Sequence, residues 1–547
     1  MPLTLTEYRI PHGALFVSTN GNDSAAGTEE SPLRNLATAV RRAPSGATIV
    51  LREGTYRESV GEVRKRLTIQ PFPTERVWLK GSVVVRDWSR DGAAWRHDGW
   101  SPELCDSCFH PDIIDAKHPL AGRPDMVFVN GKPLRQVDDR DAVGPGTFYV
   151  DTANDALFVG DNPTGSTVES TAFDRLIQFD SEQASGSAIR GIGIAQYGSN
   201  QNYGSRGAMV VVNAPGVTLR KNTFGWSASS GVGVFQPDTM VRGNHFVDNG
   251  LVGLVANRAD RLRLFGNRFT RNNRERFALS GEAIGAAGAK ITRTERPYVS
   301  DNYFRDNFGT GWWCDLGCTD ATVIRNVAMG NAVNGLYYEV SSRALIASNV
   351  VVGNGARGLK ISSSDRVRVY HNTFADNSIS VGLYNDPREP SFDPYSERLG
   401  LSWTTTGTTL VNNVYAQSEN GKPIIESEDH KSSSPRKPFV ARSDGNGYFH
   451  SDQRRASLLS WSTGSGEVTG FDSLAAFSRA TGQDRDSVSG SLDPSPFRDS
   501  ASENYALRES APGEGAGLAV PPNIAAKLSI APVPHPNIGV VAGPHAD

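Results

Sequence analysis

The sequence predicts an all-β solenoid in which short strands wind into a parallel β-helix. The first observation is a recurring Asn-x-(Phe/Val/Ala/Tyr) pattern, with steps of 22, 23, 35, 24, 23, 23 and 41 residues. The second is that each repeat holds β-branched runs such as "ALIASNVVVGN", broken by glycine and asparagine, which is typical of several strands per coil. A period near 23 residues is also too short for a helical-hairpin repeat. The pattern begins at Asn222, Asn244, Asn267, Asn302, Asn326, Asn349, Asn372 and Asn413.

The repeated asparagines are expected to stack at one corner of the solenoid and to pass amide hydrogen bonds from coil to coil. Most of them are followed five residues later by a second asparagine. Two steps exceed the period by about 12 and about 18 residues, so they mark loops added to single coils. These inserts are residues 273–287 and a stretch around residues 385–402. Added loops tend to lie on the binding face of a solenoid.

The chain is expected to divide into four parts. A helix at about residues 33–43 is predicted to cap the open end of the coils, which would otherwise expose unpaired strand edges. The 23-residue period disappears in the second part, so we expect an inserted β-rich or sandwich subdomain there. The parts are residues 14–82 (cap and first coils), 83–169 (insert), 170–417 (coils with the active site) and 418–547 (C-terminal capping segment).

Composition limits the partners. The 547 residues contain 56 Lys and Arg against 59 Asp and Glu, a net charge of −3, which gives no electrostatic case for binding nucleic acid or an anionic membrane. No apolar run approaches 18 residues, so no membrane span is expected. The first residues lack the basic and apolar regions of a signal peptide.

Four cysteines form two close pairs in the sequence, Cys105 with Cys108 and Cys314 with Cys318. Four thiolates would suit tetrahedral zinc, although the spacing of the second pair is unusual for such a site. Local disulfides or plain thiols are the favoured alternatives.

Four coils align on Gly288, Gly311, Gly335 and Gly358, and strand alternation then assigns each side chain to a face. The first and third positions after each glycine are expected to point inward: Ala289, Trp312, Leu336 and Leu359, then Ile291, Cys314, Tyr338 and Ile361. The second and fourth are expected to point outward: Lys290, Trp313, Tyr337 and Lys360, then Thr292, Asp315, Glu339 and Ser362.

Asp315 and Glu339 therefore occupy the same outward position on neighbouring coils. Strands in a sheet lie about 4.7–4.9 Å apart, and retaining glycosidases hold their two carboxyl groups about 5–5.5 Å apart. Adjacent like charges also separate the two pKa values, so that one group is an ionised nucleophile and the other a protonated acid. We expect both side chains to be solvent-accessible. The alternative is a solvated surface ladder of charges without a catalytic role.

Other residues are candidates for binding the substrate. Lys290 and Lys360 could hold charge or sugar hydroxyls, and Trp313 and Tyr337 could offer ring faces on which a sugar stacks. Two more residues are candidates for substrate binding. Glu282 lies in the first insert, and His371 precedes ladder residue Asn372. The alternative for His371 is a structural role in the turn. No metal-binding motif is present, and no cofactor is expected.

Two segments resemble known families. The opening "FVSTNGNDSAAGTEESPLRNLATAV" resembles the entry segment of secreted, pectate-lyase-like right-handed β-helix proteins. "GWWCDLG", followed one coil later by "GLYYEVS", resembles the catalytic coils of the β-xylosidases of glycoside hydrolase family 120. This resemblance implies a right-handed helix with an inserted β-sandwich, an extracellular location, Asp315 as nucleophile and Glu339 as acid/base.

The function that the sequence predicts is a retaining, exo-acting glycoside hydrolase with a carbohydrate substrate. One alternative is a polysaccharide lyase, in which Lys290 or Lys360 removes the C5 proton of a uronate and acidic residues bind Ca²⁺. The other alternative is a non-catalytic glycan-binding or adhesion protein.

Overall fold

The computed structural model of the protein describes residues 1, 3–199, 207–279, 285–417, 420–431, 438–451, 456–462 and 467–541. The chain divides into two compact units. The first unit comprises Met1–Val255 and Arg271–Ala286, and the second comprises Ala256–Thr270 and Ala287–Asp547. No helix in these described ranges is long and apolar enough to cross a membrane.

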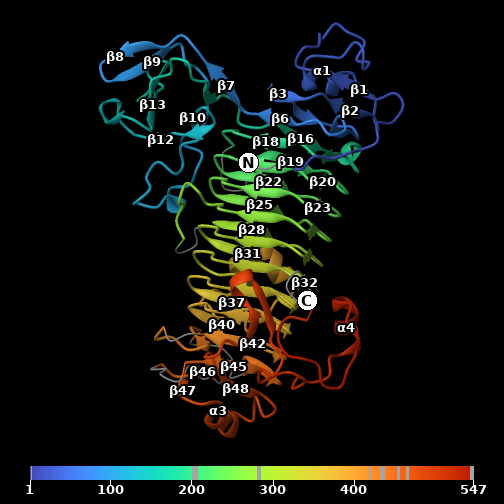
Figure 1. The fold of residues 1–547 in the computed structure, drawn as a ribbon, viewed down its shortest axis with the longest axis vertical. Coiled ribbons are helices and arrows are strands. Elements are labelled where there is room, and N and C mark those ends of the chain that lie inside the picture. The colour runs from blue at the N-terminus through green and yellow to red at the C-terminus, as the bar shows by residue number, and fades with distance from the viewer. Residues whose placement is uncertain are drawn as a thin grey trace. The chain divides into compact units, whose positions relative to one another are not determined.

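Three sheets, each with thirteen strands among the described residues, make up the coils (Figure 1). In the first unit, sheet 1 holds β1 (Leu15–Val17), β2 (Thr48–Leu51), β5 (Thr68–Pro71), β17 (Ala188–Arg190), β20 (Thr218–Arg220) and β23 (Met240–Arg242). Sheet 2 holds β3 (Gly54–Arg57), β6 (Val77–Lys80), β18 (Gly193–Ala195), β21 (Thr223–Gly225) and β24 (His245–Val247). Sheet 3 holds β4 (Gly61–Val63), β16 (Ile177–Asp180), β19 (Ala208–Asn213), β22 (Ser230–Val234) and β25 (Val252–Asn257).

The second unit continues the same order of sheets. Sheet 1 holds β26 (Arg263–Phe265), β29 (Tyr298–Ser300), β32 (Thr319–Ile324), β35 (Ser342–Ala347), β38 (Asp365–Tyr370), β41 (Thr408–Val411) and β44 (Val440–Asp444). Sheet 2 holds β27 (Arg268–Thr270), β30 (Tyr303–Arg305), β33 (Val327–Met329), β36 (Val350–Val352), β39 (Thr373–Ala375), β42 (Val414–Gln417), β45 (Gly447–His450) and β48 (Val488–Ser491). Sheet 3 holds β28 (Ala287–Thr292), β31 (Thr310–Asp315), β34 (Leu336–Glu339), β37 (Arg357–Ser362), β40 (Ile379–Asn385), β43 (Ile425–Asp429), β46 (Leu459–Ser462) and β47 (Val468–Phe471).

Successive strands along the chain enter the three sheets in turn, and successive coils pair in parallel, as β31 with β34 and β34 with β37. Of the described pairs within these sheets, β46 with β47 is antiparallel. One strand in each sheet per coil is the parallel β-helix that the sequence predicts, and the fold class is confirmed.

Two smaller sheets lie in the region where the period disappears. The first holds β11 (Lys132–Pro133), β10 (Val127–Val129), β15 (Val168–Thr171) and β7 (Ser82–Val85). The second holds β12 (Arg135–Gln136), β13 (Thr147–Asp151), β14 (Ala156–Val159), β9 (Ala94–Asp98) and β8 (Ser89–Asp91). Buried residues of both sheets, such as Val127 and Leu157, share one apolar cluster. The insert therefore has a core of its own.

Helices are few and short. The α-helices are α1 (Leu36–Arg42), α2 (Pro394–Arg398), α3 (Leu474–Thr481) and α4 (Pro522–Leu528). The 3₁₀ turns are η1 (Pro111–Ile113), η2 (Arg140–Ala142), η3 (Glu182–Ala184), η4 (Pro390–Phe392) and η5 (Ser500–Ser502). α1 falls within the predicted helix, and the Glu58 carboxylate accepts hydrogen bonds from its first two backbone amides, those of Leu36 and Ala37.

Residues beyond 418, predicted as a capping segment, contribute strands β43 to β48 to the three sheets. The chain then forms the strand pair β49 (Phe497–Asp499) and β50 (Asn504–Leu507). Leu507 and Ile538 pack against Val350 and Val414 of sheet 2. The last segment thus covers outer apolar positions of the coils as well as extending them.

Asparagine ladders run through each unit as predicted. Asn326 donates its side-chain amide to Asn349 over 3.0 Å, and Asn349 donates to Asn372 over 2.8 Å. The asparagines five residues later form a second ladder, in which Asn331 donates to Asn354 over 2.9 Å. The eight repeated asparagines are at most 1% exposed, so almost all their polar atoms must be satisfied inside the protein.

Replacing Asn349 by alanine is expected to lower the free energy of unfolding by about 2–4 kcal/mol, because buried donors and acceptors on both neighbouring coils lose their partners. Asn349 donates to Asn372 and to the Val323 carbonyl, and it accepts from Asn326. Urea unfolding of the variant measures the loss. Exposed Asn20 provides the control, and a similar loss in Asn20→Ala would contradict the ladder explanation.

Candidate active site

The parallel register places the two predicted catalytic residues at the ends of adjacent strands. Trp313 of β31 pairs with Tyr337 of β34, and Cys314 pairs with Tyr338. Asp315 and Glu339 come one residue later on each strand. The side chains of Cys314 and Tyr338 are fully buried, so alternation turns Asp315 and Glu339 away from the core. The predicted faces of these strands are confirmed.

Neither carboxylate is open to solvent, which corrects the prediction that both are accessible. Asp315 is 4% exposed and Glu339 is 6% exposed. They point away from the core, but Lys290 and Arg388 pair with them directly. Burial therefore comes from neighbouring side chains and from the second insert, and the register is as predicted.

Asp315 forms an ion pair with the neighbouring coil. Its Oδ2 lies 3.1 Å from Nζ of Lys290, and both side chains are buried. The same ammonium lies 3.2 Å from the centre of the Trp313 ring. Oδ1 of Asp315 is buried and has no hydrogen-bond partner in the described part of the chain. One carboxylate oxygen of Asp315 is thus held by Lys290, and the other is buried without a partner in the described ranges.

Glu339 is held by two donors. Nη2 of Arg388 forms an ion pair with Oε1, and Nε1 of Trp313 donates to Oε2 over 2.9 Å. Burial raises the pKa of Glu339, and the nearby charge of Asp315 raises it further, whereas Arg388 and Lys290 lower it. The balance is an elevated pKa, which is the property a general acid needs.

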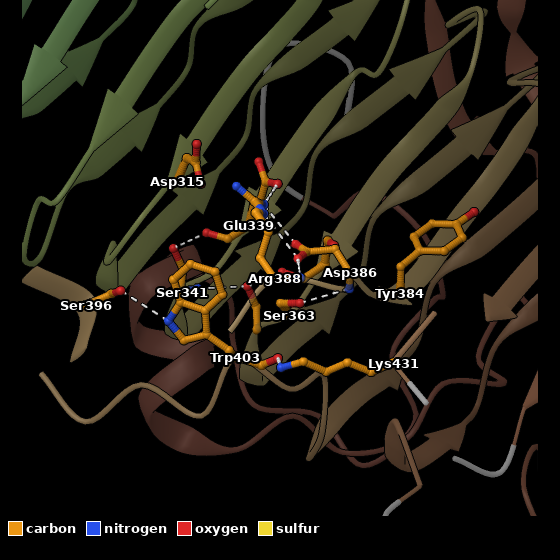
Figure 2. A network of polar contacts seen from close by, with 12 residues as sticks. Asp315, Glu339, Ser341, Ser363, Tyr384, Asp386, Arg388, Ser396, Trp403 and Lys431 are labelled. Carbon is orange, nitrogen blue, oxygen red and sulfur yellow. Dashed lines mark hydrogen bonds and ion pairs between the residues drawn. The ribbon is translucent and has the colours of Figure 1, made fainter. Parts of the chain in front are cut away.

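Arg388 lies on the second insert and connects it to the coils (Figure 2). Its guanidinium also binds Asp386, with Nε 3.1 Å from Oδ1 and Nη2 2.8 Å from Oδ2. The backbone amide of Asp386 donates to Oγ of Ser363 over 3.0 Å. Trp403 lies at the end of the insert, and its Nε1 donates to Oγ of Ser396 over 3.1 Å. Sequence reasoning identified this insert but missed Arg388 and Asp386.

The rings of Trp313 and Tyr337 pack against each other and against two lysines. Trp313 and Tyr337 stack on each other with centroids 5.1 Å apart and an interplanar angle of 19°. Lys290 covers the Trp313 ring, and Nζ of Lys360 lies 4.5 Å from the centre of the Tyr337 ring. The other faces of both rings are therefore covered by lysine side chains in this structure, and the expectation of a stacking platform for a sugar stays a prediction. The two rings meet because Trp313 and Tyr337 occupy paired positions on adjacent strands.

Lys360 is the least restrained of the cations on these strands. Its ammonium lies near the Tyr337 and Tyr384 rings and has no ion pair or hydrogen bond within the described residues. Burial lowers the pKa of Lys360, while the charge of Glu339 raises it. This lysine can therefore meet a polar group of a ligand.

The two remaining candidates do not join the site. His371 lies in the turn between β38 and β39, where it is fully buried beside Asn412, and burial lowers its pKa to about 4. Its predicted role in substrate binding is wrong, because that turn joins sheet 1 to sheet 2 and the carboxylates lie on sheet 3. Glu282 lies outside the described residues.

All four cysteines are in disulfides, Cys105 with Cys108 and Cys314 with Cys318. The local disulfides among the predicted alternatives are confirmed, and a zinc site with four thiolates is excluded. The second disulfide ties the residue before Asp315 to the turn that follows it. No group of three or more His, Cys, Asp or Glu residues in the described ranges is arranged to hold a metal ion.

Residues 210–379 match the family described as "Right handed beta helix region", and residues 19–69 match the family described as "Protein of unknown function (DUF1565)". The chain is a right-handed parallel β-helix protein. Its fold is similar to that of XylC in the complex structure of XylC with xylose, with a TM-score of 0.60 and 14% identity. That alignment covers 82% of this chain and 86% of XylC.

Two curated relatives match over short segments. Uncharacterized protein YwoF of Bacillus subtilis is 40% identical over 76 residues, 13% of this chain. Pectate lyase PEL9 of Emericella nidulans is 50% identical over 42 residues, 8% of this chain. The matches span only 16% and 10% of these two relatives' lengths.

Proposed function

We propose that this β-helix is a carbohydrate-active enzyme, a retaining glycoside hydrolase in which Asp315 is the nucleophile and Glu339 the acid/base. The observation that carries the proposal is the pairing of β31 with β34, which puts two carboxylates in the same register position one strand apart. Adjacent strands are about 4.7–4.9 Å apart, close to the separation of about 5–5.5 Å in retaining enzymes. The structural similarity to XylC and the short match to a pectate lyase support a carbohydrate substrate.

The surroundings suit two different roles for the carboxylates. The ammonium of Lys290 stabilises negative charge on Asp315, whereas burial and the charge of Asp315 raise the pKa of Glu339. Oδ1 of Asp315, which lacks a partner in the described ranges, attacks the anomeric carbon while Glu339 gives its proton to the leaving oxygen. Glu339 then takes a proton from water, and that water releases the sugar from Asp315 with net retention.

Substrate entry requires Arg388 to release Glu339. Arg388 pairs with Asp386 on the same insert, so its side chain can leave Glu339 and keep a carboxylate partner. An enclosed pair of carboxylates fits the terminal sugar of a glycan, which is why we propose exo-acting cleavage. The mechanism needs no cofactor. The extracellular location implied by the family resemblance stays a prediction.

The configuration of the product tests this proposal. The full chain is incubated with a panel of aryl glycosides, and the first-formed anomer is followed by proton NMR. A 2-deoxy-2-fluoro glycoside of the same sugar should leave a covalent adduct on the peptide that contains Asp315, detected by mass spectrometry. An inverted product, or an adduct on another residue, would overturn the assignment.

Replacing Arg388 by methionine is expected to shift the alkaline limb of kcat/KM upward by roughly one pH unit. The positive charge of Arg388 lowers the pKa of Glu339, so its removal raises that pKa and keeps the acid protonated to higher pH. The pH profile on an aryl glycoside measures the shift. Arg343→Met removes the exposed ion pair with Asp320 on sheet 1 and should leave the profile unchanged. A downward shift in Arg388→Met would contradict the role of Glu339 as acid.

A lyase is the second candidate, and Lys360 is the observation that favours it. Burial lowers the pKa of Lys360, so more of this lysine is present near neutral pH as the free amine that can accept a proton. Lys290 is less suited, because its ammonium is buried against Asp315. An unsaturated product that absorbs in the near ultraviolet, formed from a uronate polymer and lost in Lys360→Met, would support the lyase. If the chain binds glycans but turns over neither kind of substrate, the remaining alternative is a non-catalytic glycan-binding or adhesion protein.

A further inference from the structure

A second candidate site lies in the first unit. It is a cavity of about 650 Å³ whose walls come from residues 117–148 of the insert, from Trp226 and from residues 274–276. Ligand pockets in proteins commonly have volumes of about 300–1,000 Å³, so this cavity has the size of a small-molecule site. None of the proposed catalytic residues lines it.

The cavity carries an excess of positive charge. The whole chain has a net charge of −3, so a cationic lining is not its average composition. Glu275 is neutralised by an ion pair with its neighbour Arg274. The lining also includes four further cationic residues and two carboxylates, those of Asp125 and Asp138. The four are Lys117, Arg123, Arg135 and Arg276.

One wall is held in place before any ligand binds. The Arg274 guanidinium stacks over the Trp226 ring at 4.4 Å from its centre, and Trp226 packs edge-on against buried Phe128. The backbone amide of Arg274 donates to the Asn249 carbonyl over 3.1 Å. Nε of Arg274 is buried and lacks a hydrogen-bond partner among the residues that the structure describes.

The rest of the lining is apolar or accepts hydrogen bonds. Leu120, Met126 and Leu134 supply aliphatic surface. Burial, together with the charge of Asp106, raises the pKa of the Asp125 carboxyl to about 6. Asp125 and Asp138 would accept hydrogen bonds from ligand hydroxyls, which glucuronate offers on its ring.

We infer that this cavity binds a singly charged carboxylated sugar, such as a hexuronate unit. The arginine and lysine side chains would bind the carboxylate, which suits the planar guanidinium fork. The two aspartates would accept from the ring hydroxyls, and the aliphatic wall would cover the C–H face of the pyranose. The site is independent of the proposed catalysis, and a binding measurement can test it without any turnover.

Calorimetric titration of the full chain at pH 7 with four probes tests the inference. D-glucuronate carries both ring and carboxylate, D-glucose lacks the carboxylate, acetate lacks the ring, and inorganic phosphate is the competing anion. We expect glucuronate to bind at least roughly tenfold more tightly than the other three, and to bind more weakly at high salt. Tighter binding of phosphate, or equal binding of glucose, would overturn the inference.

Variants locate the binding. Arg276→Gln and Arg135→Gln each remove a cation from the cavity and should weaken glucuronate binding by roughly tenfold. Arg86→Gln changes the charge equally at an exposed arginine outside the lining and should bind like the parent chain. Asp315→Asn should also bind glucuronate fully, since it alters only the catalytic site. If Asp315→Asn loses binding while the two lining variants keep it, the uronate binds at the catalytic carboxylates and this inference fails.

Discussion

Asp315→Asn is expected to reduce kcat/KM on an aryl glycoside by at least roughly a thousandfold. The amide cannot form the glycosyl ester, so the first displacement has no nucleophile. The buried Oδ1, which has no partner in the described ranges, is the atom whose chemistry is lost. The loss is measured from the rates of the parent chain and the variant on the same glycoside, each divided by the concentration of folded protein.

Stability needs a control in this experiment, because Asp315 is buried beside Lys290. The neutral amide leaves the buried ammonium without its counter-charge and should cost about 1–3 kcal/mol of unfolding free energy. Asp320→Asn removes another aspartate from an ion pair, with Arg343, at an exposed position of β32. It should keep full activity. If Asp315→Asn is folded and retains more than about a tenth of the parent rate, Asp315 is not the nucleophile.

The coils could be predicted because a β-helix repeats its physical constraints. Each turn must satisfy a buried corner, and asparagine does so with one donor and one acceptor directed along the axis, as in the bond between Asn413 and Asn446. Asn446 also fits the motif, since Tyr448 follows it at the required spacing, yet its step of 33 residues hid it from the periodic pattern. Irregular steps therefore concealed coils that the structure contains.

The register of the site could be predicted, but its burial could not. Alternation depends only on neighbours along one strand, so it correctly turned Asp315 and Glu339 outward. Their exposure depends on Arg388, which is 49 residues beyond Glu339 and belongs to an insert without periodicity. No local pattern in the sequence specifies the path of such a loop. The one available signal is Arg388 close to Asp386, because an arginine in the loop could pair with the carboxylates of the coils.

His371 and the aromatic residues show two further limits of pattern reasoning. His371 was associated with the site through its place beside ladder residue Asn372, but that ladder runs along a corner between two other sheets. Trp313 and Tyr337 were assigned to the correct face, but equal positions on adjacent strands bring rings into contact. The stacking of Trp313 on Tyr337 uses a ring face that a sugar would otherwise contact.

Glu339→Ala is expected to behave differently from Asp315→Asn, and this difference separates the two roles. An activated aryl glycoside needs little acid assistance for its first step, so the leaving group should appear in a burst that matches the enzyme concentration. Without Glu339 as base, water attacks the glycosyl enzyme slowly. Steady-state kcat should fall by roughly a hundredfold or more, measured by stopped-flow absorbance.

Azide should then restore turnover, because an anion attacks the glycosyl enzyme without needing its proton removed. The product expected is a glycosyl azide of the same anomeric configuration as the substrate, since two displacements have occurred. Glu428→Ala is the matched control. It lies on the same outward row of sheet 3, where Glu428 pairs with Tyr384 of β40, and its side chain is 48% exposed. That variant should show parent kinetics and no response to azide. A glycosyl azide of inverted configuration from Glu339→Ala, or the absence of any azide effect despite a burst, would show that Glu339 is not the acid/base of a retaining mechanism.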